Sequence, residues 1–289
     1  MGYQIVTDTN ANIPEMLVEE LGIKVISQSF FVNSVEYKSY VKGEKTDLAK
    51  FYEMMRNKED VKTSLIGPES YADFFEEILK TGDDILYVGF SSGLSGSLQS
   101  SKIAATELLE KYPERKVVVF DTLAAALGQG LLVYKAAKLK NEGKSMEEVL
   151  EMLEKDAPKL CHWFTVDDLF FLKRGGRISG ATATFGTILN IKPVMHVDDN
   201  GKLVPVGKVR GRKQAIMSLV DKIKELGVDP ENQVMAISHG DCLDEAEFMA
   251  NEVKKQYGVK EIIINCLDPV IGAHAGPGTL ALFFIGTER

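Results

Sequence analysis

Cysteine is scarce in this sequence: Cys161, Cys242 and Cys266 are the only three among 289 residues. Their odd number and the lack of a Cys-x-x-Cys pair indicate neither a disulfide framework nor a zinc site. A chain of this length can bury a stable core without cross-links. We therefore expect no metal ion. The cysteine pattern fits a protein of a reducing compartment, the cytoplasm, best.

Long apolar runs are also missing. The longest, residues 280–285, is far short of the roughly 20 residues that a membrane-spanning helix needs. The first six residues enter a strand pattern at once, without the basic and then apolar layout of a signal peptide. Val6 stands where a myristoylation signal has Ser or Thr. We expect a soluble protein without a stable membrane anchor.

Positive charge is in the minority, with 34 Lys and Arg against 42 Asp and Glu, a net charge of −8. Nonspecific binding of nucleic acid relies on a basic surface. The charge balance therefore argues against nucleic acid as a partner, although a local basic patch is compatible with it.

The first half of the chain alternates strand and helix patterns. Residues 84–90 and 116–120 are continuous apolar runs typical of buried strands, and residues 24–31 are interpreted as one further strand. Helical spacing is present at residues 48–55 and 71–79, and Asn12 is a candidate cap for an earlier helix with Pro14 in its first turn. This alternation predicts an α/β fold with a mainly parallel sheet that helices cover on both faces.

The pattern changes after about residue 158. Residues 166–173 are expected to form a short helix that ends at Gly175-Gly176. Asn200-Gly201 lies between two strand patterns and indicates an antiparallel hairpin. We therefore predict two domains that share a cleft, residues 1–158 and 159–289, the second a mixed α/β domain with antiparallel strands.

A loop rich in Ser and Gly, residues 89–101, joins a buried strand to a helix. Backbone N–H groups and hydroxyls at a helix N-terminus favour an anion, because the N–H groups are unpaired and the helix dipole is positive there. The loop lacks the Lys-Ser/Thr ending of a Walker motif. The alternative interpretation is a helix cap made of small residues.

The same loop contains Gly89-Phe90-Ser91-Ser92-Gly93, which matches the G-x-S-x-G nucleophile elbow of α/β-hydrolases. Ser91 would then be the nucleophile, His239 or His274 the base, and Asp241 or Asp268 the acid. The chain has no HGGG-type oxyanion segment and no early antiparallel strands. A serine hydrolase stays as an alternative of a different class.

Three more segments carry polar side chains suited to an anion. The hydroxyls of Thr63 and Ser64 precede a turn, where they could bind an anion or satisfy the turn itself. Arg177 belongs to a basic group around residues 173–177 that could clamp a phosphate or carboxylate, or interact with a helix C-terminus. His274 lies in a glycine-rich stretch, residues 272–278, that we interpret as a loop with a ligand-facing imidazole.

A second basic group, which includes Lys208 and Arg210, occupies residues 208–213. Such a run is usually a solvated surface. In an acidic chain it could also meet a nucleotide or an acidic partner.

Taken in chain order, these segments resemble the motifs of the DegV family. Residues 6–14 are similar to its opening D-S-x-x-D-L-P, and residues 91–101 to its S-S-x-L-S-G-T-x-Q-S-A. The remaining similar segments are Thr63-Ser64, Asp121-Thr122 with 128–130, 166–178, 190–193, 208–210 and 272–278. Ile66 replaces the proline that usually follows the Thr-Ser pair, and Ala125-Ala126 occupy a region where the family often has serine.

The resemblance implies a bacterial lipid-binding protein, not an enzyme by itself, that encloses one long-chain fatty acid between two α/β domains. It implies no other cofactor, and it implies a fatty acid kinase as the partner that phosphorylates the bound carboxylate. Carried over by motif, the carboxylate ligands would be Thr63, Ser64, Ser91 and Ser92. Arg177 and His274 would lie near the head group, and Lys208 and Arg210 would help the kinase to dock.

Overall fold

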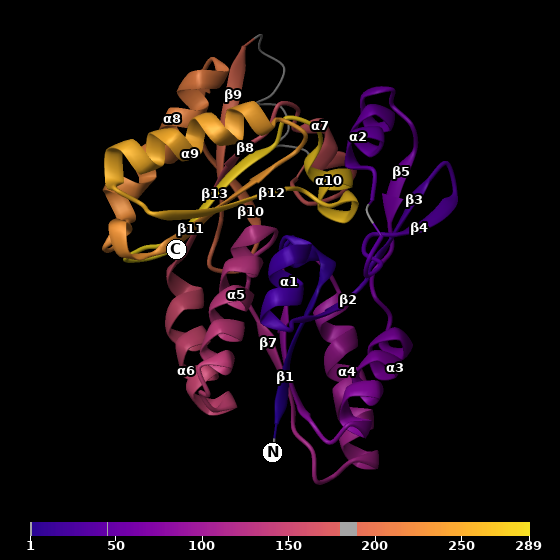
Figure 1. Ribbon diagram of the computed structural model, residues 1–289. Coiled ribbons are helices and arrows are strands. Elements are labelled where there is room, and N and C mark those ends of the chain that lie inside the picture. The colour runs from indigo at the N-terminus through magenta and orange to yellow at the C-terminus, as the bar shows by residue number, and fades with distance from the viewer. Residues whose placement is uncertain (1, 45, 180–189) are drawn as a thin grey trace.

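The computed structural model describes residues 2–44, 46–179 and 190–289 of the chain. Its strands form three sheets (Figure 1). The four-stranded sheet has the order β2-β1-β6-β7 and is parallel throughout. Its strands are β1 (Tyr3–Asp8), β2 (Lys24–Ile26), β6 (Asp84–Gly89) and β7 (Val117–Asp121).

Helices cover both faces of this parallel sheet. In β6, Ile85 and Tyr87 pack with side chains of α3 and α4, whereas Leu86 and Val88 pack with side chains of α5. Successive side chains of a strand point to opposite faces, so β6 is buried on both sides. Figure 1 shows α3 and α4 on one side of the sheet and α5 and α6 on the other. The expected fold of the first half is confirmed. The helices are α1 (Glu15–Leu21), α3 (Pro68–Lys80), α4 (Ser97–Lys111), α5 (Leu127–Asn141) and α6 (Met146–Asp156).

The second large sheet has six strands in the order β10-β9-β8-β13-β11-β12, and β11 with β12 is its parallel pair. Leu282 and Phe284 pack with side chains of α8 and α9, while Phe283 packs on the opposite face with side chains of α5. The expected hairpin at Asn200-Gly201 joins β9 to β10. A mixed α/β arrangement is thus confirmed for the second half. Its elements are β8 (Leu160–Thr165), β9 (Ile191–Val197), β10 (Leu203–Arg210), α8 (Arg212–Leu226), β11 (Val234–His239), α9 (Leu243–Tyr257), β12 (Glu261–Cys266) and β13 (Leu280–Ile285).

A third, antiparallel sheet of three strands, in the order β4-β3-β5, was not expected from the sequence. It consists of β3 (Ser29–Val32), β4 (Val35–Lys38) and β5 (Val61–Thr63), and α2 (Leu48–Arg56) packs beside it. The prediction of one strand over residues 24–31 was therefore wrong. The chain leaves the parallel sheet after Ile26 and enters the small sheet at Ser29, because the side chain of Gln28 is buried and bonded to Asn10 and to the carbonyl of Ser64.

Two further expectations need correction, and one strand was not expected from the sequence. Residues 160–165 form strand β8, and only α7 (Phe170–Arg174) is helical in the segment expected to be helix. Both faces of β8 are buried, and periodicity alone does not separate such a strand from a buried helix. Asn12 ends a short 3-10 turn, η1 (Thr9–Ala11), in the left-handed conformation, and Pro14 precedes α1.

The first part of the glycine-rich stretch, residues 272–275, is helical and not a loop, and residues 276–278 follow the helix. Helix α10 (Pro269–Ala275) begins because the Asp268 carboxylate accepts the N–H of Ile271 at 2.8 Å and Pro269 fits the first turn. His274 is consequently held in the last turn of a helix.

The strands of the four-stranded and three-stranded sheets lie before residue 158 in the sequence, and those of the six-stranded sheet lie after it. Side chains of α5 belong to one apolar core with strands of both large sheets, so the halves are packed together. The boundary between residues 158 and 159 stays a prediction. Among the described residues, no helix is long and apolar enough to span a membrane.

Candidate functional site

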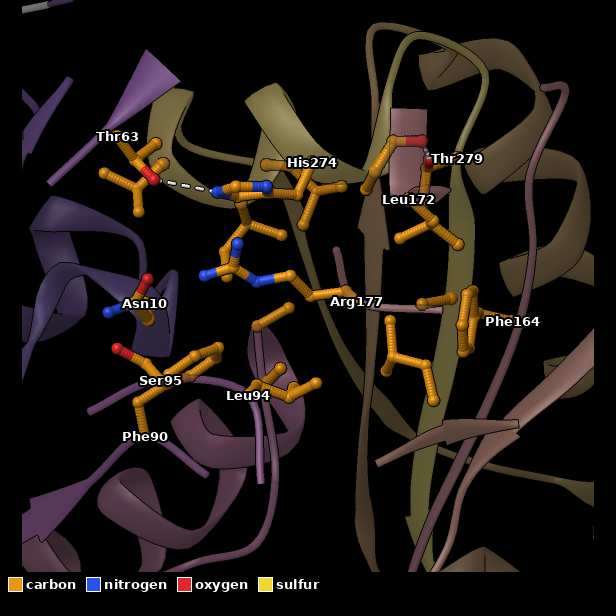
Figure 2. A pocket seen from close by; sticks show the side chains of 18 of the residues that line it. Asn10, Thr63, Phe90, Leu94, Ser95, Phe164, Leu172, Arg177, His274 and Thr279 are labelled. Carbon is orange, nitrogen blue, oxygen red and sulfur yellow. Dashed lines mark hydrogen bonds between the residues drawn. The ribbon is translucent and has the colours of Figure 1, made fainter. Parts of the chain in front are cut away.

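A cavity lies where elements of all three sheets meet (Figure 2). Its inner part is small, about 80 Å³, and most of its wall is apolar, from Phe90 and Leu94 to Phe164, Leu172, Leu203, Leu267, Val270, Ile271 and Ala281. An outer cavity of about 590 Å³ adjoins it. The two parts share Gln28, Thr63, Leu94, Ser95, Arg177 and His274, so a mainly polar ring stands between an apolar interior and the outside.

Thr63 and His274 form the centre of this ring. Thr63 is the last residue of β5, His274 lies on α10, and Thr63 Oγ1 is 2.8 Å from His274 Nε2. The other ring nitrogen, Nδ1, is buried and lacks a partner among the described residues. It faces Gly175, where a Cβ would overlap it, so only glycine allows this close approach of α7 and α10.

The unpaired Nδ1 indicates which tautomer His274 adopts. Burial and the nearby Arg177 and Arg174 lower the pKa of His274 to about 3, so the ring is neutral and carries one proton. A buried N–H without an acceptor is rarer than an acceptor without a donor. The proton therefore belongs on Nε2, which donates to Thr63 Oγ1. The Thr63 hydroxyl is then left to donate its own proton to a ligand.

Arg177 brings a positive charge into the same ring. Burial lowers the pKa of Arg177, and its Nη1 donates a hydrogen bond to the carbonyl of Gly175. Within the described part of the chain, no carboxylate forms an ion pair with it. Figure 2 shows its side chain extending across the cavity below His274. A half-buried guanidinium without a counter-charge is suited to bind a carboxylate or phosphate.

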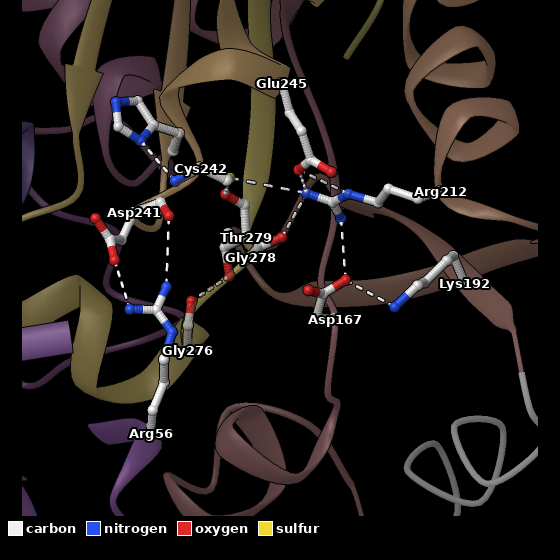
Figure 3. Close-up of polar contacts among 11 residues, drawn as sticks. Arg56, Asp167, Lys192, Arg212, Asp241, Cys242, Glu245, Gly276, Gly278 and Thr279 are labelled. Atoms are coloured by element: carbon white, nitrogen blue, oxygen red, sulfur yellow. Dashed lines mark hydrogen bonds and ion pairs between the residues drawn. The ribbon is translucent and has the colours of Figure 1, made fainter. Parts of the chain in front are cut away.

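Helix α10, which carries His274, is anchored by contacts at both of its ends. At its start, Asp268 caps the helix and also accepts the Ser39 hydroxyl at 3.3 Å. After its end, the Gly278 carbonyl accepts Nη2 of Arg212 at 2.6 Å, and Arg212 also pairs with Glu245 at 2.6 Å (Figure 3). These contacts fix the position of His274 before any ligand binds.

Ser91, expected at the carboxylate, does not line the cavity. Its side chain is fully buried, its hydroxyl donates to the Gly201 carbonyl at 2.8 Å, and it accepts the Gly93 N–H at 3.1 Å. The structure therefore does not bring Ser91 to this cavity, and its hydroxyl joins the Ser/Gly loop to the turn between β9 and β10.

Ser92 is exposed and lines neither cavity, whereas Ser95 of the same loop lines both. The Ser95 hydroxyl lies 3.0 Å from that of Ser97 and accepts the Ser97 N–H at 3.2 Å. With Ser97 as the donor between the two hydroxyls, the proton of Ser95 is available to a ligand. The structure thus favours Ser95 over Ser92 as the serine that faces the anion.

The remaining expected residues occupy different places. Ser64 lines the outer cavity only, and its carbonyl accepts the Gln28 amide. Lys208 and Arg210 lie exposed on β10, away from both cavities. The described residues contain no group of His, Cys, Asp or Glu that could hold a metal ion.

The structure gives no support to the hydrolase alternative. A serine nucleophile needs a general base within hydrogen-bonding reach. Among the described residues, the contacts of Ser91 Oγ are with Gly201 and Gly93, while His274 bonds to Thr63 and His239 accepts the N–H of Cys242. Asp268 serves as the cap of α10.

Asn10, Gln28 and His162 also line the cavity and were not expected from the sequence. Asn10 and Gln28 bond to each other through their side chains at 2.8 Å, and Asn10 further bonds to the buried carboxyl of Asp8. Burial raises the pKa of that carboxyl. The only signal in the sequence was polar residues next to strand ends, which is too common to single them out.

Comparisons with known proteins agree in one family. The family model described as "Uncharacterised protein, DegV family" matches residues 3–287. A DegV domain-containing protein of Clostridium perfringens is 43% identical over 287 residues, which is 99% of this chain and 98% of the relative.

Solved structures give the same result. One described as "Fatty Acid Binding of a DegV family Protein" from Thermus thermophilus has a TM-score of 0.87 and 33% identity, and the match covers 99% of this chain and 100% of that chain. Another, described as "DegV, a fatty acid binding protein" from Bacillus subtilis, has a TM-score of 0.84 and 30% identity, with 99% and 100% covered.

We predict that Ser91→Ala lowers the free energy of unfolding by about 1–3 kcal/mol, because it leaves the buried Gly201 carbonyl and Gly93 N–H without their partner. The matched change Ser92→Ala should stay within about 0.5 kcal/mol of the parent protein, since Ser92 is exposed. Urea denaturation of both variants measures the difference. Equal stability of the two would contradict the role given to Ser91.

A second prediction concerns pH. Burial raises the pKa of Asp268 to about 7 from an ordinary value of 3.8. Between these values the folded protein keeps a proton that the unfolded chain has lost, so this group makes the folded state less stable as pH rises. Asp268→Asn, which keeps a capping side chain, removes this titration. The free energy of unfolding of the parent protein relative to the variant should therefore fall from pH 4 to pH 8. A difference that stays constant over this range would show that Asp268 titrates normally.

Proposed function

The chain belongs to the DegV family, and from this premise we propose that it binds one long-chain fatty acid and presents the carboxylate to a fatty acid kinase. The observation that carries the proposal is Arg177, which pairs with no carboxylate among the described residues and lies beside the Thr63–His274 pair at the edge of an apolar cavity. Fatty acid binding is what the solved structures from Thermus thermophilus and Bacillus subtilis are described as showing for those proteins.

The distribution of polar groups sets the orientation of the ligand. The anion ligands stand where the inner and outer cavities join, and the inner wall beyond them is mainly Leu, Ile, Val, Phe and Ala. An acyl chain gains free energy only by leaving water, so it belongs inside, and the charged group belongs at the junction. Figure 2 shows Thr63 and His274 on one side of the cavity and Phe164 on the other.

Three side chains would hold the carboxylate. The Thr63 hydroxyl, oriented by His274 Nε2–H, and the Ser95 hydroxyl would each donate one hydrogen bond. Arg177 would supply the opposite charge. Ser64 lies on the outer side of this group, where it could contact the ligand oxygen that faces outward.

The tail supplies most of the binding free energy. About fourteen methylenes at roughly 0.8 kcal/mol each yield on the order of 11 kcal/mol before the costs of ordering are subtracted. The inner cavity of about 80 Å³ is smaller than a typical ligand pocket of roughly 300–1,000 Å³. Binding must therefore separate the apolar walls, and part of the gain offsets the cost of that separation.

The position of the carboxylate suits presentation to a partner. Because the outer cavity adjoins the ring of Thr63, Ser95 and Arg177, a phosphoryl donor could approach the carboxylate from outside without disturbing the buried tail. Lys208 and Arg210 add positive charge to the exposed face of β10, where they would attract an acidic surface of the kinase.

We predict that Thr63→Val lowers the affinity for palmitate about ten- to hundredfold, because it removes one hydrogen bond to a charged group and keeps the side-chain shape. Thr106→Val is the matched control: Thr106 is exposed on α4 and its hydroxyl bonds to the Lys102 carbonyl. Displacement of a fluorescent fatty acid measures both variants. Unchanged affinity in Thr63→Val would place the carboxylate elsewhere, and no binding by the parent protein would reject the function.

Presentation to the kinase gives a separate prediction. Lys208→Glu combined with Arg210→Glu should lower kcat/KM of acyl phosphate formation by the kinase with ATP at least tenfold, while palmitate binding stays unchanged. Lys254→Glu with Lys255→Glu changes the net charge equally on exposed residues of α9 and should leave the rate unchanged. The acyl phosphate is trapped with hydroxylamine, and its amount is quantified to give the rate. Equal rates for both double variants would exclude β10 as the docking surface.

A further inference from the structure

The inner end of the cavity contains a histidine. His162 lies on β8, lines the inner cavity, and is only 5% exposed. Its ring packs edge-on against Phe283 with 4.5 Å between ring centroids, and Phe164 is 5.9 Å away. His162 is absent from the outer cavity. It therefore belongs to the part of the cavity that would receive the tail of a fatty acid and not its carboxylate.

Neither ring nitrogen of His162 has a hydrogen bond to a described residue, and Nδ1 is fully buried. On that side the ring packs against the start of α5, where a Cβ at Gly128 would lie 3.4 Å from Nδ1. An unpaired acceptor costs less than an unpaired donor, so Nδ1 is the bare nitrogen and Nε2 carries the proton. An N–H donor that has no acceptor among the described residues thus remains beside apolar groups.

The surroundings exclude two simple partners for this donor. Burial lowers the pKa of His162 to about 3, so the ring is neutral and does not attract a carboxylate as a cation would. A buried water needs two to four polar partners. The residues that the structure places against the ring are Phe164, Phe283 and Gly128, which offer no polar side chain.

We propose that the inner end of the cavity recognises an oxygen atom on the acyl chain, so that the preferred ligand is a long-chain hydroxy or oxo fatty acid whose oxygen accepts a hydrogen bond from His162. This inference rests on the proposed function, because it assumes that the chain enters tail first. A plain alkyl chain leaves the donor unpaired, whereas an oxygenated chain pairs it. Sites built to hydrogen-bond a substrate discriminate against analogues that lack the bonding group.

The test compares stearate with a set of monohydroxystearates that carry the hydroxyl at successive carbons of the distal half of the chain. Displacement of a fluorescent fatty acid from the full-length protein gives each affinity. We expect at least one isomer to bind about fivefold or more tightly than stearate, as one net hydrogen bond provides. In His162→Leu, which keeps the side-chain volume, the preference should disappear, so that stearate and the hydroxystearates bind with similar affinity.

His196→Leu is the matched control, because His196 lies on the neighbouring strand β9, stacked on Trp163, and does not line the cavity. This variant should keep the preference. If the parent protein binds stearate and every hydroxystearate equally, or if His162→Leu retains the preference, the inference is wrong while fatty acid binding stands. If the parent protein binds none of these acids, the proposed function falls and the inference falls with it. Should His162→Leu fail to fold, the comparison of ligands in the parent protein still decides.

Discussion

The hydrogen bond between Thr63 and His274 joins two elements that are 211 residues apart in the sequence. It connects the small antiparallel sheet to α10, and it lies at the boundary between the polar ring and the apolar interior. Because Nδ1 of His274 is enclosed against Gly175, the bond also fixes which atom carries each proton. The proposed direction of the ligand, head outward and tail inward, depends on this arrangement.

Polar groups whose pairing among the described residues is incomplete line the cavity. Buried polar groups in folded proteins are almost always paired, so an unpaired group needs an explanation. Within the described residues, Arg177 has no carboxylate partner, and the Nδ1 atoms of His274 and His162 have no hydrogen bond. All three residues line the same cavity. The anionic head of the proposed ligand would give Arg177 a counter-charge, and an oxygen on its tail would pair the Nε2–H of His162, while the two Nδ1 atoms remain bare acceptors.

The sequence predicted the parts of the fold that depend on local pattern. Helices α2 and α3 each have one apolar face, and Asn200-Gly201 is typical of a hairpin turn, so the sequence predicted these three elements. It did not predict the switch between sheets at Gln28, which depends on a distant hydrogen-bond network, or strand β8, which is buried on both faces. At the site, the sequence predicted Thr63, Arg177 and His274 as residues near the head group, and the structure brings them to one cavity. The sequence pointed to Ser91 and Ser92, whereas Ser95 of the same loop lines the cavity, because only the path of the backbone decides which hydroxyl faces inward.

The central claim is that this cavity holds a fatty acid with its carboxylate at Thr63 and Arg177. The most direct measurement is mass spectrometry of organic extracts from freshly purified protein, together with native mass spectra of the same sample. The account predicts one long-chain acid per chain, lost from native spectra when Arg177→Leu replaces the charge. A protein that carries no such acid and takes up none when palmitate or oleate is added would contradict the account.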